Sequence, residues 1–220
     1  MRQKKAAEPQ RDMRSFVDRL ARQGAVKLSR KLTVDGLKIV GDKGTDKIVE
    51  ALGLIRDFDP VRYRRLLRDV GQILVTVLPA SVAQWAEASK ACELDERYLI
   101  DDARTAEHVA STIVHEATHA RLMRCGIGYE EEIRDRVERV CLRREIAFAA
   151  RLPIGADAAQ RAEANLEAMP DFSDKAMRER HLDGLRDALL YLNMPVWLVS
   201  LMVSYRRWQH RRRVARRATG

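Results

Sequence analysis

Apolar residues recur every three or four positions through most of this chain, which is the spacing of amphipathic α-helices. Residues 15–32 show this spacing first, and residues 45–54 follow, with Thr45 as the expected N-cap. Pro60 opens a third, arginine-rich helix, because proline suits the first position of a helix. Further helices are predicted over residues 103–124, 129–152, 156–168, 177–192 and 195–213.

Strand patterns are shorter and fewer than helix patterns. Residues 72–78, QILVTVL, are rich in β-branched side chains and end at Pro79, which predicts a strand. Apolar and polar positions alternate in residues 91–100, which predicts a second strand, and turn-forming residues in 34–44 indicate a short strand or hairpin. The fold class expected from this pattern is α+β, predominantly helical, with a small β-sheet.

The fourth predicted helix contains an HExxH motif made of His115, Glu116 and His119. Residues four apart lie on the same face of a helix, so both imidazoles can bind one Zn²⁺ ion. Glu116 is then close enough to reach a metal-bound water, and the small residues Ala117 and Thr118 suit a half-buried helix. The competing interpretation is an ordinary amphipathic helix in which this spacing arose by chance.

A zinc site needs a third protein ligand, and the chain geometry after the motif suggests where it lies. The helix ends near Gly126, so an antiparallel helix that follows reaches the level of the histidines near residues 135–142. Glu138 falls in that window and is the predicted ligand. Glu145 lies about two turns further along the same face and is the reserve candidate. Either glutamate can instead be a solvated charge.

The remaining candidates near the motif have supporting roles. A zinc-binding histidine usually donates its other ring N–H to a carboxylate or a carbonyl. Asp101, Asp102 and Glu145 are the candidates for that partner, and the sequence does not rank them. His108 is expected to be a surface or core histidine rather than a ligand, because the ligand set is complete without it.

The net charge of +9 comes from the two ends of the chain. Residues 1–31 and 206–220 each carry a net charge of +7, whereas residues 32–205 carry −5. Basic ends of this kind bind nucleic acid or anionic lipid. The ends contain few aromatic residues and no recognition motif, so sequence-specific binding of nucleic acid is not expected.

The cysteines and the apolar segments bear on localisation. The three cysteines lack CxxC spacing, and no apolar signal segment opens the chain, which together predict reduced thiols in a bacterial cytoplasm. Residues 188–205 contain no charge and precede an arginine-rich segment. They are interpreted first as a packed helix, second as part of a region, residues 188–217, that lies on the anionic inner face of a membrane, and third as a single membrane span.

The HExxH motif and a glutamate on the next helix resemble the zinc metallopeptidases called zincins, and within them the gluzincin arrangement. The resemblance covers about residues 72–152. It implies that His115, His119 and Glu138 bind Zn²⁺ and that Glu116 is the general base for a zinc-activated water. The implied function is a zinc metallopeptidase with a zincin-like core that hydrolyses peptide bonds in a peptide or protein substrate.

The resemblance also implies that an edge strand, within residues 92–100, binds the extended substrate. Two positions depart from well-known members: Cys125 stands where some zincins have a third histidine, and Leu142 follows Glu138 where an aspartate is frequent. The domains expected on this basis are a disordered basic N-terminus (1–14), a zincin-like metal-binding domain (15–155), C-terminal helices (156–205) and an arginine-rich tail (206–220).

Two other classes of function compete with a peptidase. The first is a non-catalytic zinc-binding scaffold or regulatory domain, attached to a membrane surface or to nucleic acid by its basic ends. The second is a protein that associates with nucleic acid through those ends alone. Glu116 favours the enzyme, because a domain that only binds zinc does not need it.

Overall fold

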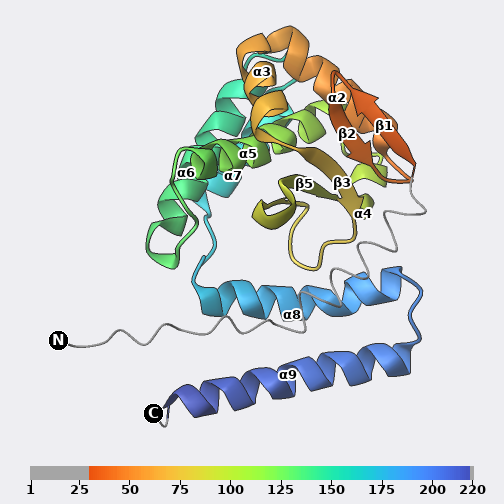
Figure 1. Ribbon diagram of the computed structural model, residues 1–220, viewed down its shortest axis with the longest axis vertical. Coiled ribbons are helices and arrows are strands. Elements are labelled where there is room, and N and C mark those ends of the chain that lie inside the picture. The colour runs from red at the N-terminus through yellow and green to blue at the C-terminus, as the bar shows by residue number, and fades with distance from the viewer. Residues whose placement is uncertain (1–29, 219–220) are drawn as a thin grey trace, which may run out of the picture.

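The computed structural model describes residues 30–218, and the chain has an α+β fold that is mostly helical, with a small mixed five-stranded sheet (Figure 1). The disordered segment expected at 1–14 and most of the helix expected over 15–32 lie outside the described residues. The prediction that this helix includes residues 31 and 32 was wrong, because they belong to the strand β1 (Lys31–Val34). It pairs with β2 (Leu37–Val40) through a turn at Asp35 and Gly36. Both turn residues have positive φ, as tight hairpins require.

The strand order in the sheet is β1-β2-β3-β5-β4. β3 (Gln72–Thr76) runs parallel to β2 and to β5 (Ala91–Asp95), which confirms the strand predicted at 72–78. All five residues of β5 are buried, as expected for a parallel strand with neighbours on both sides. β4 (Ala83–Ala86) is antiparallel to β5 and forms one edge of the sheet, and β1 forms the other.

Two predictions about these strands were wrong. The strand expected over 91–100 ends at Asp95, whose carboxylate accepts hydrogen bonds from the backbone N–H groups of Arg97 and Tyr98. This N-cap starts α4 (Glu96–Ile100) and outweighs the alternating pattern. β5 is also an inner strand, so the edge strand beside α5 is not within 92–100 but is β4, which the sequence pattern did not predict.

The predicted helices are present with shifted ends. The long central helix, α5 (Ala106–Arg124), begins after Thr105, which forms a reciprocal cap with His108. At the second predicted helix, Gly44 rather than Thr45 holds the N-cap position. The remaining elements are α2 (Thr45–Phe58), α3 (Pro60–Asp69), a 3-10 turn (Glu87–Ser89), α6 (Glu131–Ala149), α7 (Ala156–Glu167), α8 (Asp174–Tyr191) and α9 (Val196–Ala218).

The core lies between the sheet and the helices α2, α3 and α5. Ile39, Ile73 and Leu94 from the sheet and Ile48 and Ile113 from the helices are almost fully buried there. α5 also packs against α6 and β4, so it is held on several sides. This enclosure fixes the HExxH segment as part of the core rather than as a surface helix.

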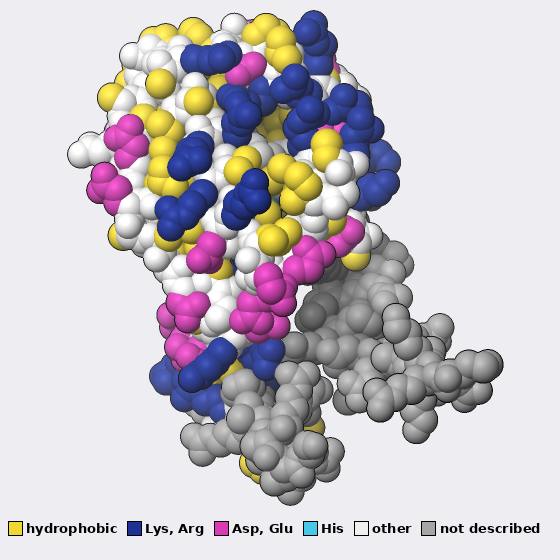
Figure 2. Space-filling view, turned by 90° about the vertical axis from the view of Figure 1, so that its left-hand side faces the viewer, with side chains coloured by type: hydrophobic (Ala, Val, Ile, Leu, Met, Phe, Trp, Pro, Cys, Tyr) yellow, Lys and Arg dark blue, Asp and Glu magenta, His cyan; other side chains and the backbone are white. Residues whose placement is uncertain are grey.

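The last three helices differ in what they pack against. α7 packs against α6 and α5, whereas α8 and α9 pack against each other as a hairpin beneath the rest of the fold (Figure 1). Among the described residues, no helix combines the length and the apolar character that crossing a membrane requires. In Figure 2, Lys and Arg side chains gather on the upper part of the visible face, and Asp and Glu form a band between that part and the C-terminal helices.

Candidate metal centre

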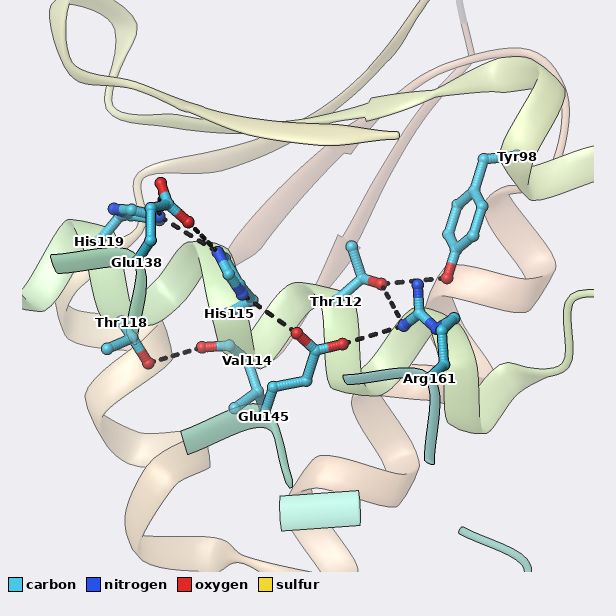
Figure 3. A network of polar contacts seen from close by, with 9 residues as sticks. All are labelled: Tyr98, Thr112, Val114, His115, Thr118, His119, Glu138, Glu145 and Arg161. Carbon is cyan, nitrogen blue, oxygen red and sulfur yellow. Dashed lines mark hydrogen bonds and ion pairs between the residues drawn. The ribbon is translucent and has the colours of Figure 1, made fainter. Parts of the chain in front are cut away.

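Side chains from α5 and α6 converge at one point beside the sheet (Figure 3). α5 ends at Arg124, and the φ of 79° at Gly126 allows the chain to reverse, so α6 returns alongside α5. The Nε2 atoms of His115 and His119 lie 3.2 Å apart. One oxygen of Glu138 lies 3.3 Å from Nε2 of His115, and the other lies 3.5 Å from Nε2 of His119. Three donor groups therefore face one another.

These separations match the donor set of a tetrahedral zinc ion. Zinc–nitrogen and zinc–oxygen bonds of about 2.0–2.1 Å place neighbouring donors about 3.3–3.4 Å apart at tetrahedral angles. The three separations here run from 3.2 to 3.5 Å, and a different oxygen of Glu138 faces each of the two nitrogens. Two imidazole nitrogens and one carboxylate also leave a fourth corner open. The residues therefore have the chemistry of a zinc site, and a turn of the Glu138 carboxylate would bring one oxygen toward both nitrogens.

Cys141 is a second candidate for the third donor. Its Sγ and the ring nitrogens of His115 and His119 all lie within 4.8 Å of one another. Burial, followed by the charges of nearby carboxylates, raises the pKa of this thiol. Because zinc binds the thiolate, and Glu138 presents oxygens at tetrahedral spacing, we favour Glu138 as the third donor. Cys141 lies one turn after Glu138 and was not among the site residues expected from the sequence.

Tyr129 is a further site residue that the sequence analysis missed. Its hydroxyl donates a hydrogen bond to Glu138, and its ring meets the ring of His119 edge to face, with the centroids 5.3 Å apart. The residue lies in the loop between α5 and α6, where a lone tyrosine carries no recognisable signal. Its contacts hold Glu138 and His119 in their present orientation.

Glu145 does not join the three donors but lies on the other side of His115. Its Oε2 is 3.1 Å from Nδ1 of His115, and its Oε1 accepts a hydrogen bond of 2.9 Å from Arg161 of α7. Glu145 therefore occupies the position of the carboxylate that orients a metal-binding histidine, which was one of its two expected roles. Arg161 also lies 3.4 Å from Thr112, whose hydroxyl is 3.0 Å from that of Tyr98 (Figure 3).

The other two carboxylates considered for that role lie elsewhere. Asp101 and Asp102 are exposed in the loop before α5, where Asp101 accepts a hydrogen bond from the backbone N–H of Ala103. His108 is buried and takes part in the cap at the start of α5, which confirms the core interpretation of this histidine.

The two imidazoles have opposite pKa shifts. Burial lowers the pKa of His115, but its hydrogen bonds to Glu138 and Glu145 outweigh burial and raise the pKa to about 10. Burial and the positive charge of His115 lower the pKa of His119 to about 4. The carboxylates that raise the pKa of His115 are also placed to balance the charge of a divalent cation.

Glu116 lies between the histidines and the edge strand. Its side chain is buried, and this burial raises its pKa to about 7, although the charge of His115 and a hydrogen bond from the backbone of Trp85 act in the opposite direction. A cleft of about 620 Å³ opens at this point. Its lining includes β4, Glu116, the three donor residues, Tyr129 and part of α8. A carboxylate that can exchange a proton therefore faces the space where a ligand would lie.

No protein-family model, no curated protein and no solved structure matches this chain.

Proposed function

We propose that this protein is a zinc-dependent hydrolase, and specifically a metallopeptidase. The observation that carries the proposal is the convergence of His115, His119 and Glu138 within 3.5 Å of one another beside the buried carboxylate of Glu116. A zincin-like core is part of the proposal. It is supported by a mixed sheet whose antiparallel edge strand, β4, packs against the HExxH helix.

The proposed chemistry divides the work between the metal and the chain. A zinc ion held by the three donors supplies Lewis acidity, which activates water and polarises a carbonyl group. Glu116 accepts the proton of the attacking water and then donates it to the leaving amine. Glu145 holds the ring of His115 through Nδ1, and Tyr129 holds the carboxylate of Glu138.

The proposed substrate is an extended segment of a peptide or protein. β4 pairs with β5 on one side, and the cleft runs along its residues Ala83, Gln84 and Trp85. An extended peptide can pair with the backbone of such an edge strand, which gives affinity, while pockets select side chains. We therefore transfer the substrate-binding role from residues 92–100 to β4.

Removal of the metal tests the function directly. We expect the full chain to cleave members of a peptide mixture, to stop after dialysis against a chelator, and to recover with one equivalent of Zn²⁺. Mass spectrometry of the mixture measures each step. Cleavage that persists in the metal-free protein would contradict the proposal. Zinc binding with no cleavage of any peptide would instead favour the non-catalytic scaffold.

Because Glu145 orients His115 without binding the metal in this proposal, its replacement should weaken zinc binding or activity without abolishing either. Replacing Glu145 with glutamine is expected to lower zinc affinity or activity by about 10- to 100-fold, because the amide oxygen is a weaker partner for Nδ1 of His115. Competition with a fluorescent chelator measures the affinity. Glu132→Gln, at an exposed position in the first turn of the same helix, is the matched control. Equal zinc affinity and equal activity in the two variants would rule out this role.

A further inference from the structure

An apolar stripe runs along the exposed side of α9. Trp197, Leu201, Tyr205 and Trp208 are spaced at four, four and three residues, so they lie on one side of the helix. Their exposed fractions are 70%, 61%, 53% and 47%. Val199, on the opposite side, is 1% exposed. The helix therefore buries one apolar face in the protein and presents a second one to solvent.

Positive charge follows this stripe along the same helix. Residues 206–220 contain seven arginines and no acidic residue, and α9 continues as a helix to Ala218. Arg207 forms an ion pair with Asp183 of α8 at 3.2 Å, and the other arginines follow in sequence. Aromatic and leucine side chains next to a dense basic segment are typical of helices that lie in the interface of an anionic membrane.

We propose that α9 docks this protein onto an anionic lipid surface, with the stripe from Trp197 to Trp208 inserted among the lipids and arginines of 211–217 against their phosphates. The helix lies parallel to the surface, because α8 covers its opposite side. Tryptophan and tyrosine favour the boundary between headgroups and acyl chains, and each arginine near the surface adds electrostatic attraction. The proposal does not depend on the metal centre.

Other occupants of the stripe fit the charges less well. A second copy packed parallel would bring its own arginines toward the first set, and these repel each other. An antiparallel copy would offer the arginines no acidic partner, because α9 contains no Asp or Glu. Residues 1–29 of the same chain are also basic, so they are poor partners for α9. Nucleic acid would attract the arginines but gives no reason for exposing Leu201 and Trp197. A lipid surface accounts for both the apolar and the basic part.

Flotation with lipid vesicles tests the proposal on the full chain. We expect the protein to float with vesicles that contain about 30% phosphatidylglycerol in phosphatidylcholine, and to bind pure phosphatidylcholine at least about tenfold more weakly. The double variant Trp197→Ser, Leu201→Ser is expected to lose at least about tenfold in binding to the anionic vesicles. The triple variant Arg211→Gln, Arg212→Gln, Arg213→Gln is expected to lose a similar factor.

The matched control removes exposed apolar side chains elsewhere. Val61→Ser, Ile154→Ser alters residues that are 47% and 79% exposed in other helices or loops, and it should bind anionic vesicles like the unchanged protein. Circular dichroism confirms that each variant is folded. Absence of binding to anionic vesicles overturns the proposal. So does equal loss in the control variant, a dimer that the Trp197→Ser, Leu201→Ser change dissociates without any vesicle binding, or binding to DNA without binding to vesicles.

Discussion

Replacing Glu116 with glutamine is expected to lower the rate of peptide cleavage by about 10²–10⁴-fold while the protein keeps its zinc. Glutamine has nearly the same shape but cannot accept a proton from water. Glu116 is buried at the cleft beside the three donors, yet no donor separation in the proposed zinc site involves it. The change should therefore remove the proton transfer and leave metal binding intact. Cleavage rate and zinc content, measured on the same preparation, check the expected loss of cleavage and the expected retention of zinc.

A carboxylate on the same helix provides the control for Glu116. Glu107 lies in the first turn of α5, more than two turns before the motif, and Glu107→Gln should keep both activity and zinc. Full cleavage activity in Glu116→Gln would remove the general base from the account. Loss of zinc in that variant would show that Glu116 contributes to the metal site itself.

Replacing His119 with alanine is expected to abolish activity and to lower zinc affinity by more than about 100-fold, beyond the usual cost of losing a residue that only orients a ligand. Two protein ligands would remain, and His115 with Glu138 alone cannot complete a tetrahedral site. Zinc content after dialysis against a weak chelator measures the effect.

Cys141→Ala is the informative comparison for His119→Ala. Both residues belong to the group whose donor atoms lie within 4.8 Å, but the account assigns the third ligand to Glu138. The cysteine variant is therefore expected to keep its zinc. If it loses zinc as completely as His119→Ala does, the thiolate and not the carboxylate is the third ligand. If His119→Ala retains a full equivalent of zinc, the proposed ligand set is wrong.

The HExxH helix and the nearby glutamate could be predicted because they depend on spacing along the chain. Positions i and i+4 share a helix face, and equal rise per residue in two antiparallel helices brought Glu138 level with the histidines. The same reasoning could not assign Glu145, because axial spacing does not tell which ring nitrogen of His115 a carboxylate meets. The buried ion pair between Glu145 and Arg161 holds the carboxylate on the Nδ1 side of His115.

The edge of the sheet could not be predicted for a different reason. β4 is only four residues long, AQWA, and most of its residues have no strong preference for strands. It becomes a strand by pairing with β5, which is a tertiary effect. Conversely, residues 96–100 had the alternating pattern of a strand, but the cap from Asp95 made them helical. Tyr129 and Cys141 belong to no sequence motif, and only the packing of α6 and its preceding loop against α5 brings them to the site.

The X-ray absorption spectrum of the zinc-loaded full chain at the zinc edge tests the central claim most directly. We expect one tightly bound zinc per chain, with nitrogen and oxygen neighbours at about 2.0–2.1 Å and the scattering pattern of two imidazoles. A sulfur neighbour at about 2.3 Å would show that Cys141, and not Glu138, is the third zinc ligand. A chain that binds no zinc at all would contradict the account as a whole.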